Sequence, residues 1–128
     1  MNYRVDQYGR LTYVECLPGG NRIATEQDAL DWVAICGENE TDRLLLYADC
    51  LTDDFFRLST GVAGGILLKF VNYRLKVAAV IPPALANQGK FGEMVIETNR
   101  GNQFRVFDDR KDAVEWLSGE RNAKDTNL

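Results

Sequence analysis

The sequence has no histidine, and only three cysteines and three prolines among its 128 residues. Histidine is the side chain that ordinarily titrates near neutral pH, and the chain also lacks GxSxG and HExxH motifs. Hydrolytic triads are therefore excluded. We expect a non-enzymatic protein with no catalytic residue and no cofactor, with a Glu, Lys, Tyr or Cys in an unusual site as the alternative. Cys16, Cys36 and Cys50 are too widely spaced for a disulfide framework or a CxxC motif, so we expect buried thiols, with Cys50 the candidate for reactivity.

The chain also lacks a basic excess and any long apolar run. Its net charge is -4, and no cluster of Lys and Arg is present to neutralise phosphates, so nucleic acid is not an expected partner. No segment has the length of a membrane span, and residues 1–6 do not resemble a signal peptide, so we expect a cytoplasmic protein without membrane contact. Its length and its 45% hydrophobic content predict one domain over residues 1–120, followed by a polar tail at residues 121–128.

Short apolar runs predict five strands, at residues 3–6, 11–17, 44–48, 77–81 and 103–107. The first two flank Tyr8-Gly9 and alternate, which predicts an antiparallel hairpin. The third and fourth are continuously apolar, as expected of central strands that are buried on both faces. The fifth alternates and is expected at an edge. The pattern indicates an α/β fold with about five strands in a mixed, mostly parallel sheet.

Apolar residues at spacings of three and four predict about four helices between and after these strands. Thr25 is expected to cap the first helix, which ends near Gly37, and Asp108-Asp109 to begin the last. Gly101 is expected to end the third helix in the left-handed conformation. The side chains expected to face inward are Ala29, Leu30, Val33 and Cys36 in the first helix, Val62, Ala63, Ile66, Leu67, Phe70 and Val71 in the second, Phe91, Met94 and Val95 in the third, and Ala113, Val114 and Leu117 in the last.

Two resemblances follow from this order and from local motifs. The element order is similar to that of anti-sigma-factor antagonist domains, which have the STAS or SpoIIAA-like fold. A second resemblance covers nearly the whole chain and is to the domain of unknown function family numbered 4180, which implies a bacterial cytoplasmic protein. The segments that carry it are Leu51-Thr52-Asp53-Asp54-Phe55-Phe56, Ser59-Thr60-Gly61-Val62-Ala63-Gly64, Lys69-Phe70-Val71-Asn72-Tyr73-Arg74 and Glu97-Thr98-Asn99-Arg100-Gly101.

The antagonist resemblance implies a phosphorylation site. In those domains an aspartate ends the third strand, and an Asp-Ser-Ser-Gly-Leu-Gly motif begins the second helix. Here Asp49 ends the strand and Ser59-Thr60-Gly61 follows, so Thr60 matches the serine that a partner kinase phosphorylates. Leu58 stands where the motif has aspartate. A phosphate there would lie at a helix N-terminus, where negative charge is favoured. The alternative is that Ser59 or Thr60 only caps the helix.

Acidic residues form a second candidate site. Open α/β sheets bind ligands at the carboxyl ends of their strands, where three carboxylates could hold Mg²⁺. The alternative is that these residues occupy first turns of helices, where the helix dipole favours negative charge, and we expect no metal site. The residues at these strand ends are Asp49, Thr52, Asp53, Asp54, Asp108 and Asp109.

We therefore expect a STAS-like regulatory module that acts through a protein partner, with a switch at Ser59 or Thr60. The alternative function is a small-molecule or anion-binding domain that uses the start of the second helix, including Gly61, and the neighbouring strand ends. A shallow exposed surface would favour the first, and a concave pocket with converging polar groups the second. The first hairpin or an apolar helix face could support a homodimer.

Overall fold

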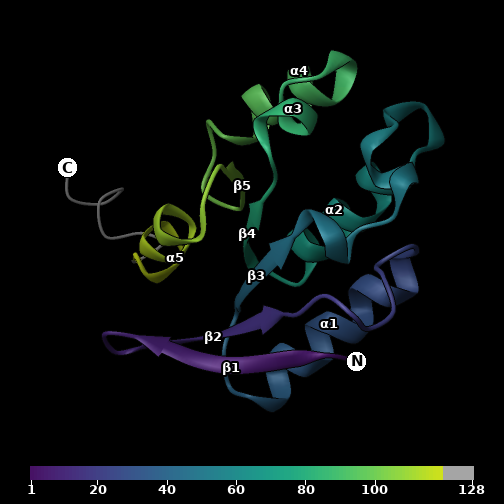
Figure 1. The fold of residues 1–128 in the computed structure, drawn as a ribbon. Coiled ribbons are helices and arrows are strands. Elements are labelled where there is room, and N and C mark those ends of the chain that lie inside the picture. The colour runs from purple at the N-terminus through teal and green to yellow at the C-terminus, as the bar shows by residue number, and fades with distance from the viewer. Residues whose placement is uncertain (120–128) are drawn as a thin grey trace.

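The computed structural model describes residues 1–119, so the polar tail expected at residues 121–128 lies outside the described residues. The five strands form one sheet in the order β1-β2-β3-β4-β5 (Figure 1). β1 is antiparallel to β2, and the remaining neighbours are parallel, which confirms the mixed, mostly parallel sheet and the edge position of the last strand. The strands are β1 (Tyr3–Tyr8), β2 (Leu11–Cys16), β3 (Arg43–Tyr47), β4 (Lys76–Val80) and β5 (Phe104–Phe107).

The hairpin turn follows from the sequence. Tyr8 pairs with Leu11, so the loop is the two residues Gly9 and Arg10, and Gly9 has a φ of 62°. A two-residue hairpin turn requires positive φ, which glycine adopts without a steric penalty. The turn fixes the register of the whole hairpin, including the pairing of Arg4 with Glu15.

Within residues 1–119 there are five helices, one more than expected. The additional helix is the single turn α3, which begins at Pro83, because proline is favoured in the first turn of a helix as well as at the end of a strand. The helices are α1 (Glu26–Glu38), α2 (Val62–Asn72), α3 (Pro83–Ala86), α4 (Gly89–Thr98) and α5 (Arg110–Ser118). Thr25 caps α1 with a capping box, and Asp109 caps α5, as expected.

The connectivity decides which face each helix covers. The parallel strands advance in one direction from β2 to β5, and right-handed crossovers that all advance the same way place their helices on the same face. The larger core, with Trp32, Ile66 and Phe91, accordingly lies between the sheet and α1, α2 and α4. No strand follows α5 within the described chain, and Figure 1 shows α5 on the opposite face of the sheet. Ala113, Val114 and Leu117 pack it against that face.

Three details of the sequence prediction are wrong. Val71 is 38% exposed, because the buried stripe of α2 is centred on Ala63, Ile66 and Phe70. Leu30 is only partly buried, because the buried stripe of α1 is centred on Ala29, Trp32 and Cys36. Gly101 is not left-handed. The chain leaves α4 through right-handed backbone at Asn99 (φ -70°, ψ -10°), and a further turn bond joins the Gly101 N–H to the Thr98 carbonyl.

The segment between β3 and α2 consists of three short 3₁₀ turns, Ala48–Cys50, Asp53–Phe56 and Leu58–Thr60. An aromatic cluster anchors it: the ring centroid of Phe91 lies 5.9 Å from that of Phe55 and 5.1 Å from that of Phe56. Edge-to-face contacts of this kind stabilise a loop beyond the area they bury. The segment is thereby held against α4 and positions the start of α2.

No helix within residues 1–119 has the length and apolar character needed to cross a membrane.

Candidate functional site

The start of α2 brings together three of the residues expected to matter. Gly61 is the N-cap residue, with a left-handed backbone (φ 80°, ψ -4°) and no side chain to cap the helix. The exposed Thr60 hydroxyl replaces that cap. It accepts a hydrogen bond from the Val62 N–H at 3.2 Å and lies 2.8 Å from the Arg57 carbonyl and 2.9 Å from the Asp54 carbonyl, to which it donates its proton. Ser59 is exposed beside it.

A shallow hollow of about 290 Å³ lies in front of Thr60 and Gly61. Its opposite wall is the start of α1, with Thr25 and Glu26, so the N-termini of two helices meet there. The Glu26 carboxylate already supplies the negative charge that helix N-termini favour, and it pairs with Lys69 at 3.7 Å. A carboxylate in this position disfavours binding of a further anion.

The outer face of α2 continues from this hollow. Leu68 is 56% exposed and Val71 is 38% exposed, and Gly64 precedes them on the same side of the helix. Lys69 is the one charged residue of α2, and it pairs with Glu26. We name Gly61, Gly64, Leu68 and Val71 the α2 surface. A solvent-facing helix without charge on its outer stripe is typical of a surface that another protein covers.

The acidic residues do not join Thr60. Asp49 lines a separate hollow of about 340 Å³ at the carboxyl ends of β3 and β4, with Tyr47, Pro82 and Asp108. Asp53 and Asp54 are exposed in the first turn of their 3₁₀ turn. Within residues 1–119, no three acidic or thiol side chains are placed to hold a metal ion. Asp49 and Thr60 therefore lie at different hollows, and Asp53 and Asp54 line neither of the two.

Thr52 is the one predicted site residue with an unusual polar atom. It precedes the 3₁₀ turn at Asp53, yet its side chain makes no capping hydrogen bond. Its Oγ1 is buried and has no hydrogen-bond partner within the part of the chain that the structure describes. The hydroxyl therefore contributes packing to the loop rather than a polar contact to either hollow.

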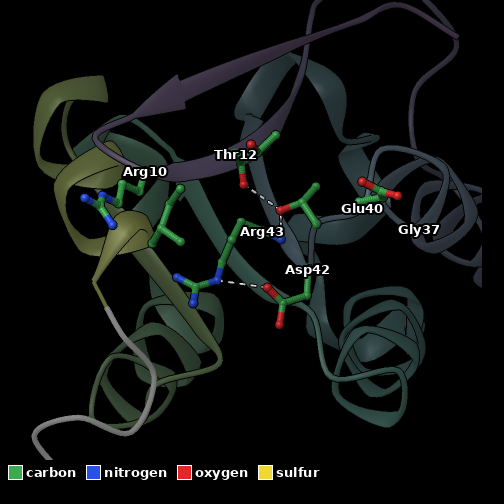
Figure 2. A pocket seen from close by; sticks show the side chains of 8 residues that line it. Arg10, Thr12, Gly37, Glu40, Asp42 and Arg43 are labelled. Atoms are coloured by element: carbon green, nitrogen blue, oxygen red, sulfur yellow. Dashed lines mark hydrogen bonds and ion pairs between the residues drawn. The ribbon is translucent and has the colours of Figure 1, made fainter.

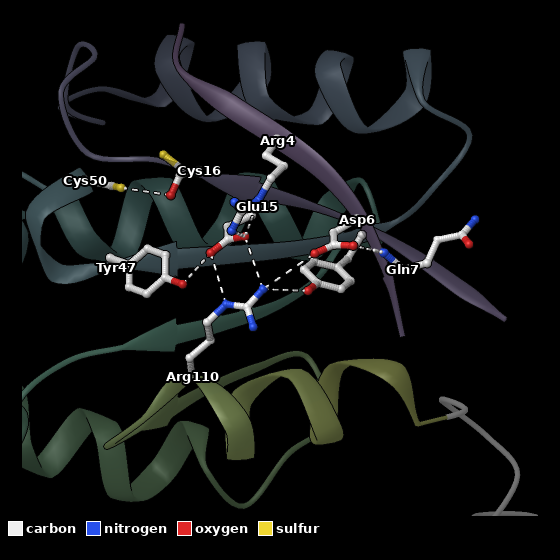
Figure 3. Close-up of polar contacts among 9 residues, drawn as sticks. Arg4, Asp6, Gln7, Glu15, Cys16, Tyr47, Cys50 and Arg110 are labelled. Atoms are coloured by element: carbon white, nitrogen blue, oxygen red, sulfur yellow. Dashed lines mark hydrogen bonds and ion pairs between the residues drawn. The ribbon is translucent and has the colours of Figure 1, made fainter. Parts of the chain in front are cut away.

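A buried carboxylate, Glu15, was not predicted from the sequence. Glu15 belongs to β2 and is 2% exposed, and its carboxylate is contacted by side chains from β1, β3 and α5 (Figure 3). Its Oε1 accepts from the Arg4 Nη2 at 2.7 Å, and its Oε2 accepts from the Tyr47 hydroxyl at 2.5 Å and from the Arg110 Nε at 3.2 Å. Arg110 also donates to the Tyr13 hydroxyl at 2.9 Å.

This network controls the ionisation of its members. Burial raises the pKa of Glu15, but hydrogen bonds from Arg110, Tyr47 and Arg4 outweigh burial and hold that pKa below its ordinary value. Burial and the hydrogen bond to Glu15 raise the pKa of Tyr47 to about 12. Glu15 is thus a charged, fully bonded group that joins the hairpin to β3 and α5.

The signal for Glu15 is present in the sequence. The two-residue turn at Gly9 places Glu15 opposite Arg4, and β2 is an inner strand whose two faces are both covered. A carboxylate in such a strand is expected to be paired, because an isolated buried charge is too costly. The contribution of Arg110, 95 positions away, was not visible in the local pattern.

A third hollow, of about 510 Å³, lies at the opposite end of the sheet, near the amino end of β3 (Figure 2). Arg10, Glu40, Asp42 and Arg43 line it. The Arg43 Nε donates to the Asp42 Oδ1 at 3.0 Å, and the Arg43 Nη1 donates to the Gly119 carbonyl at 2.8 Å beyond α5. Arg43 and Asp42 are therefore held at this hollow by contacts within the chain.

A model of the family described as Domain of unknown function (DUF4180) matches residues 9–117. The chain belongs to this family. The match spans the hairpin turn, the hollows at Asp49 and at Thr60, and most of α5. Glu15, Thr60 and Arg110 therefore all lie within the part that defines the family. No curated protein and no solved structure matches the chain.

Proposed function

We propose that this protein is a non-enzymatic, cytoplasmic regulatory module of STAS-like type, which binds a partner protein through the α2 surface and is switched by phosphorylation at Thr60. The partner is a protein kinase of the class that regulates anti-sigma-factor antagonist domains. The STAS-like assignment is supported by the order of elements, in which an antiparallel hairpin is followed by parallel strands that advance in one direction.

The observation that carries the proposal is the position of Thr60 at the start of an exposed, uncharged helix face. Leu68 and Val71 offer apolar area to a partner, and the exposed Thr60 hydroxyl lies at the N-terminal end of the same helix. The neighbouring hollow is shallow and contains a carboxylate, which favours a protein surface over a site for a small anion.

A phosphoryl group on Thr60 would alter both charge and local structure. Transfer of the phosphoryl group from ATP to Oγ1 releases ADP and the hydroxyl proton, so the hydrogen that Oγ1 shares between the Arg57 and Asp54 carbonyls is lost. The phosphate adds almost two negative charges next to Glu26. A partner seated on the α2 surface would then face repulsion and an added desolvation cost. Ser59 is the alternative acceptor in the same turn.

The hollow at Asp49 supports the rival function of small-molecule binding. It lies where open α/β sheets usually bind ligands, and Tyr47, Asp49 and Asp108 offer polar groups at its wall. Val80→Trp would fill this hollow while leaving the α2 surface intact. Partner binding that survives Val80→Trp and is lost in Leu68→Ser supports the proposed function, and the reverse result contradicts it.

The test uses tagged protein purified from its native host, with Leu68→Ser as the variant and Ile96→Ser as the matched control. Ile96 is 60% exposed on α4, so both changes replace an exposed apolar side chain. The captured complex is supplied with ATP, and phosphate is located on the tryptic peptide of residues 58–69 by mass spectrometry. We expect the native protein and Ile96→Ser to retain the partner and to gain phosphate on Thr60.

The decisive controls are Thr60→Ala and Ser59→Ala. Thr60→Ala should abolish the phosphate signal, and Ser59→Ala should leave it. Retention of the same proteins by Leu68→Ser, or the absence of phosphate from both Ser59 and Thr60, would contradict the proposed function.

A further inference from the structure

The outer side of β1 presents backbone groups that are not bonded to any other strand within residues 1–119. The Leu17 N–H donates to the Asn2 carbonyl at 2.9 Å, so this is a hydrogen-bonded position of the ladder. Hydrogen-bonded and non-hydrogen-bonded pairs alternate in an antiparallel ladder. The N–H and C=O groups of Tyr3, Val5 and Gln7 therefore point away from β2. The Gln7 N–H agrees, because it donates to the Asp6 side chain at 2.8 Å rather than to β2.

The opposite edge of the sheet is closed in a way that β1 is not. At β5, the Asn99 side chain donates to the Val106 carbonyl at 3.3 Å and accepts from the Val106 N–H at 2.9 Å. An amide side chain thus takes the place of a neighbouring strand. Within residues 1–119, no strand pairs with the outer side of β1, and all six of its residues are exposed.

β1 carries two charged residues, Arg4 and Asp6, but lacks the other features that protect an edge. Its sequence contains no proline and no lysine, and its ladder with β2 runs without a bulge from Tyr3 to Tyr8. Tyr3 and Val5 are 37% and 42% exposed, and they lie on the same face of the strand. An open edge with apolar side chains is a template for pairing with another strand.

The charges of β1 select one way for two copies to pair. In an antiparallel pair of β1 strands, the outward residues Tyr3, Val5 and Gln7 must face one another to form hydrogen bonds. Centring the pair on Arg4 would place two arginines opposite each other, and centring it on Asp6 would place two aspartates opposite each other. Centring it on Val5 places each Arg4 opposite Asp6 of the second copy, and every outward group of the three residues then has a partner.

We propose that β1 pairs with β1 of a second copy of this chain, antiparallel and centred on Val5, so that the two sheets join into one. Val5 packs against Val5 of the second copy on the face that carries α1. Arg4 and Asp6 of the two copies form ion pairs on the opposite face, where Arg4 already binds Glu15 and Asp6 already lies 3.8 Å from Arg110. The partner is a second copy because the strand is complementary to itself in charge and in hydrogen bonding.

The first test is sedimentation of the native protein and two variants over a range of concentrations. Val5→Pro removes an N–H that points outward, so it leaves the pairing with β2 intact. We expect the native protein to dimerise and Val5→Pro to weaken the dimer at least tenfold. Leu68→Ser, on the α2 surface, should dimerise like the native protein. A native protein that stays monomeric at the highest attainable concentration, or a Val5→Pro protein that dimerises normally, would overturn the proposal.

The second test fixes the register and remains informative if Val5→Pro does not fold. Val5→Cys would bring two thiols together at the centre of the pair, with Cα atoms about 5.5 Å apart, which suits a disulfide. Gln7→Cys is the matched control, because in this register its two copies lie about 13 Å apart along the strands, about four residues at 3.3 Å each. Mild oxidation should cross-link Val5→Cys and not Gln7→Cys. Equal cross-linking of both variants, or of neither, would refute this register.

Discussion

Glu15 shows how a single buried charge is accommodated in this fold. Its carboxylate accepts hydrogen bonds from Arg4, Tyr47 and Arg110, and the partners come from β1, β3 and α5. Removing the charge leaves these donors with a weaker acceptor in a site from which water is largely excluded. The network therefore acts as a structural joint between the hairpin and the rest of the sheet.

Glu15→Gln is expected to lower the free energy of unfolding by about 2 kcal/mol at neutral pH, because hydrogen bonds to a charged group contribute roughly this amount. Glu97→Gln is the matched control. Glu97 pairs with Arg100 on the surface at 3.3 Å, and such exposed pairs contribute less than about 1 kcal/mol. Urea unfolding of both variants provides the measurement. Equal losses from the two variants would show that burial does not strengthen the Glu15 contacts.

At the residue scale, local chemistry was the best guide. Thr25 and Asp109 cap their helices as expected, because a side-chain oxygen just before a helix can accept a hydrogen bond from an N–H group of the first turn. Gly101 did not adopt the left-handed conformation, since the helix ended through ordinary turn bonds that any residue accommodates. The hydrogen bonds of Thr60 depend on a sequence of three 3₁₀ turns, and no pattern in the sequence specified those turns.

Side chains from β3 and β4 bind the carboxyl end of α5. The Lys76 ammonium donates to the carbonyls of Trp116 and Gly119, both at 2.9 Å, and lies 4.5 Å from the centre of the Trp116 ring. Arg43 binds the Leu117 and Gly119 carbonyls. Cations at the carboxyl end of a helix also interact favourably with its dipole.

Lys76→Met is expected to destabilise the protein by about 1 to 2 kcal/mol, because two hydrogen bonds and a cation–π contact are lost while the aliphatic packing is kept. Hydrogen exchange of the α5 amides should accelerate more than exchange in α1. Lys111→Met, an exposed change on α5 itself, should leave both quantities nearly unchanged. Uniform acceleration across all elements would contradict a local role for Lys76.

Asn99→Ala is expected to cost about 1 kcal/mol, because the Val106 backbone loses both of its side-chain partners. The change also opens the β5 edge, so light scattering should show more association at high concentration. Asn72→Ala, at the exposed end of α2, is the control and should behave like the native protein. An Asn99→Ala protein with native stability and no added association would refute this role.

At the element scale, hydrophobic periodicity identified all five strands and the four longer helices. The periodicity gave a wrong result at Val71, which is apolar and adjoins the buried stripe of α2 but is exposed to solvent. Apolar character alone does not show where the buried stripe ends. α3 was missed because two consecutive prolines indicate only that the strand ends. The 3₁₀ turns before α2 were missed because Phe55 and Phe56 pack against Phe91, a contact between distant segments.

At the scale of the whole molecule, Glu15 should shape the dependence of stability on pH. Its pKa in the folded protein is held below the ordinary value, so its contribution is present above the ordinary glutamate pKa and is lost as the pH falls through the folded value. The difference in unfolding free energy between the native protein and Glu15→Gln should thus be constant near neutrality and disappear in acid. Urea unfolding across an acid series tests this, and a difference that grows with acidity would have the wrong sign.

The arrangement of the whole molecule could be predicted in outline and not in detail. The alternation of strands and helices predicts the parallel sheet, and crossover handedness then explains why α1, α2 and α4 share a face. The sequence did not separate the Thr60 hollow from the Asp49 hollow. Both follow β3 in the chain, and their separation depends on how the 3₁₀ turns carry the backbone from Asp49 to Gly61.

The order of the strands has a consequence for synthesis on the ribosome. Each strand that emerges pairs with the strand made just before it, so the sheet can grow from β1 toward β5 without waiting for distant segments. Arg110 is the exception, because it belongs to the last helix and completes the contacts of Glu15, which is made near the beginning. Until Arg110 emerges, the nascent sheet carries a carboxylate that is only partly neutralised. The contacts of Glu15 are therefore complete only after the last helix has been made.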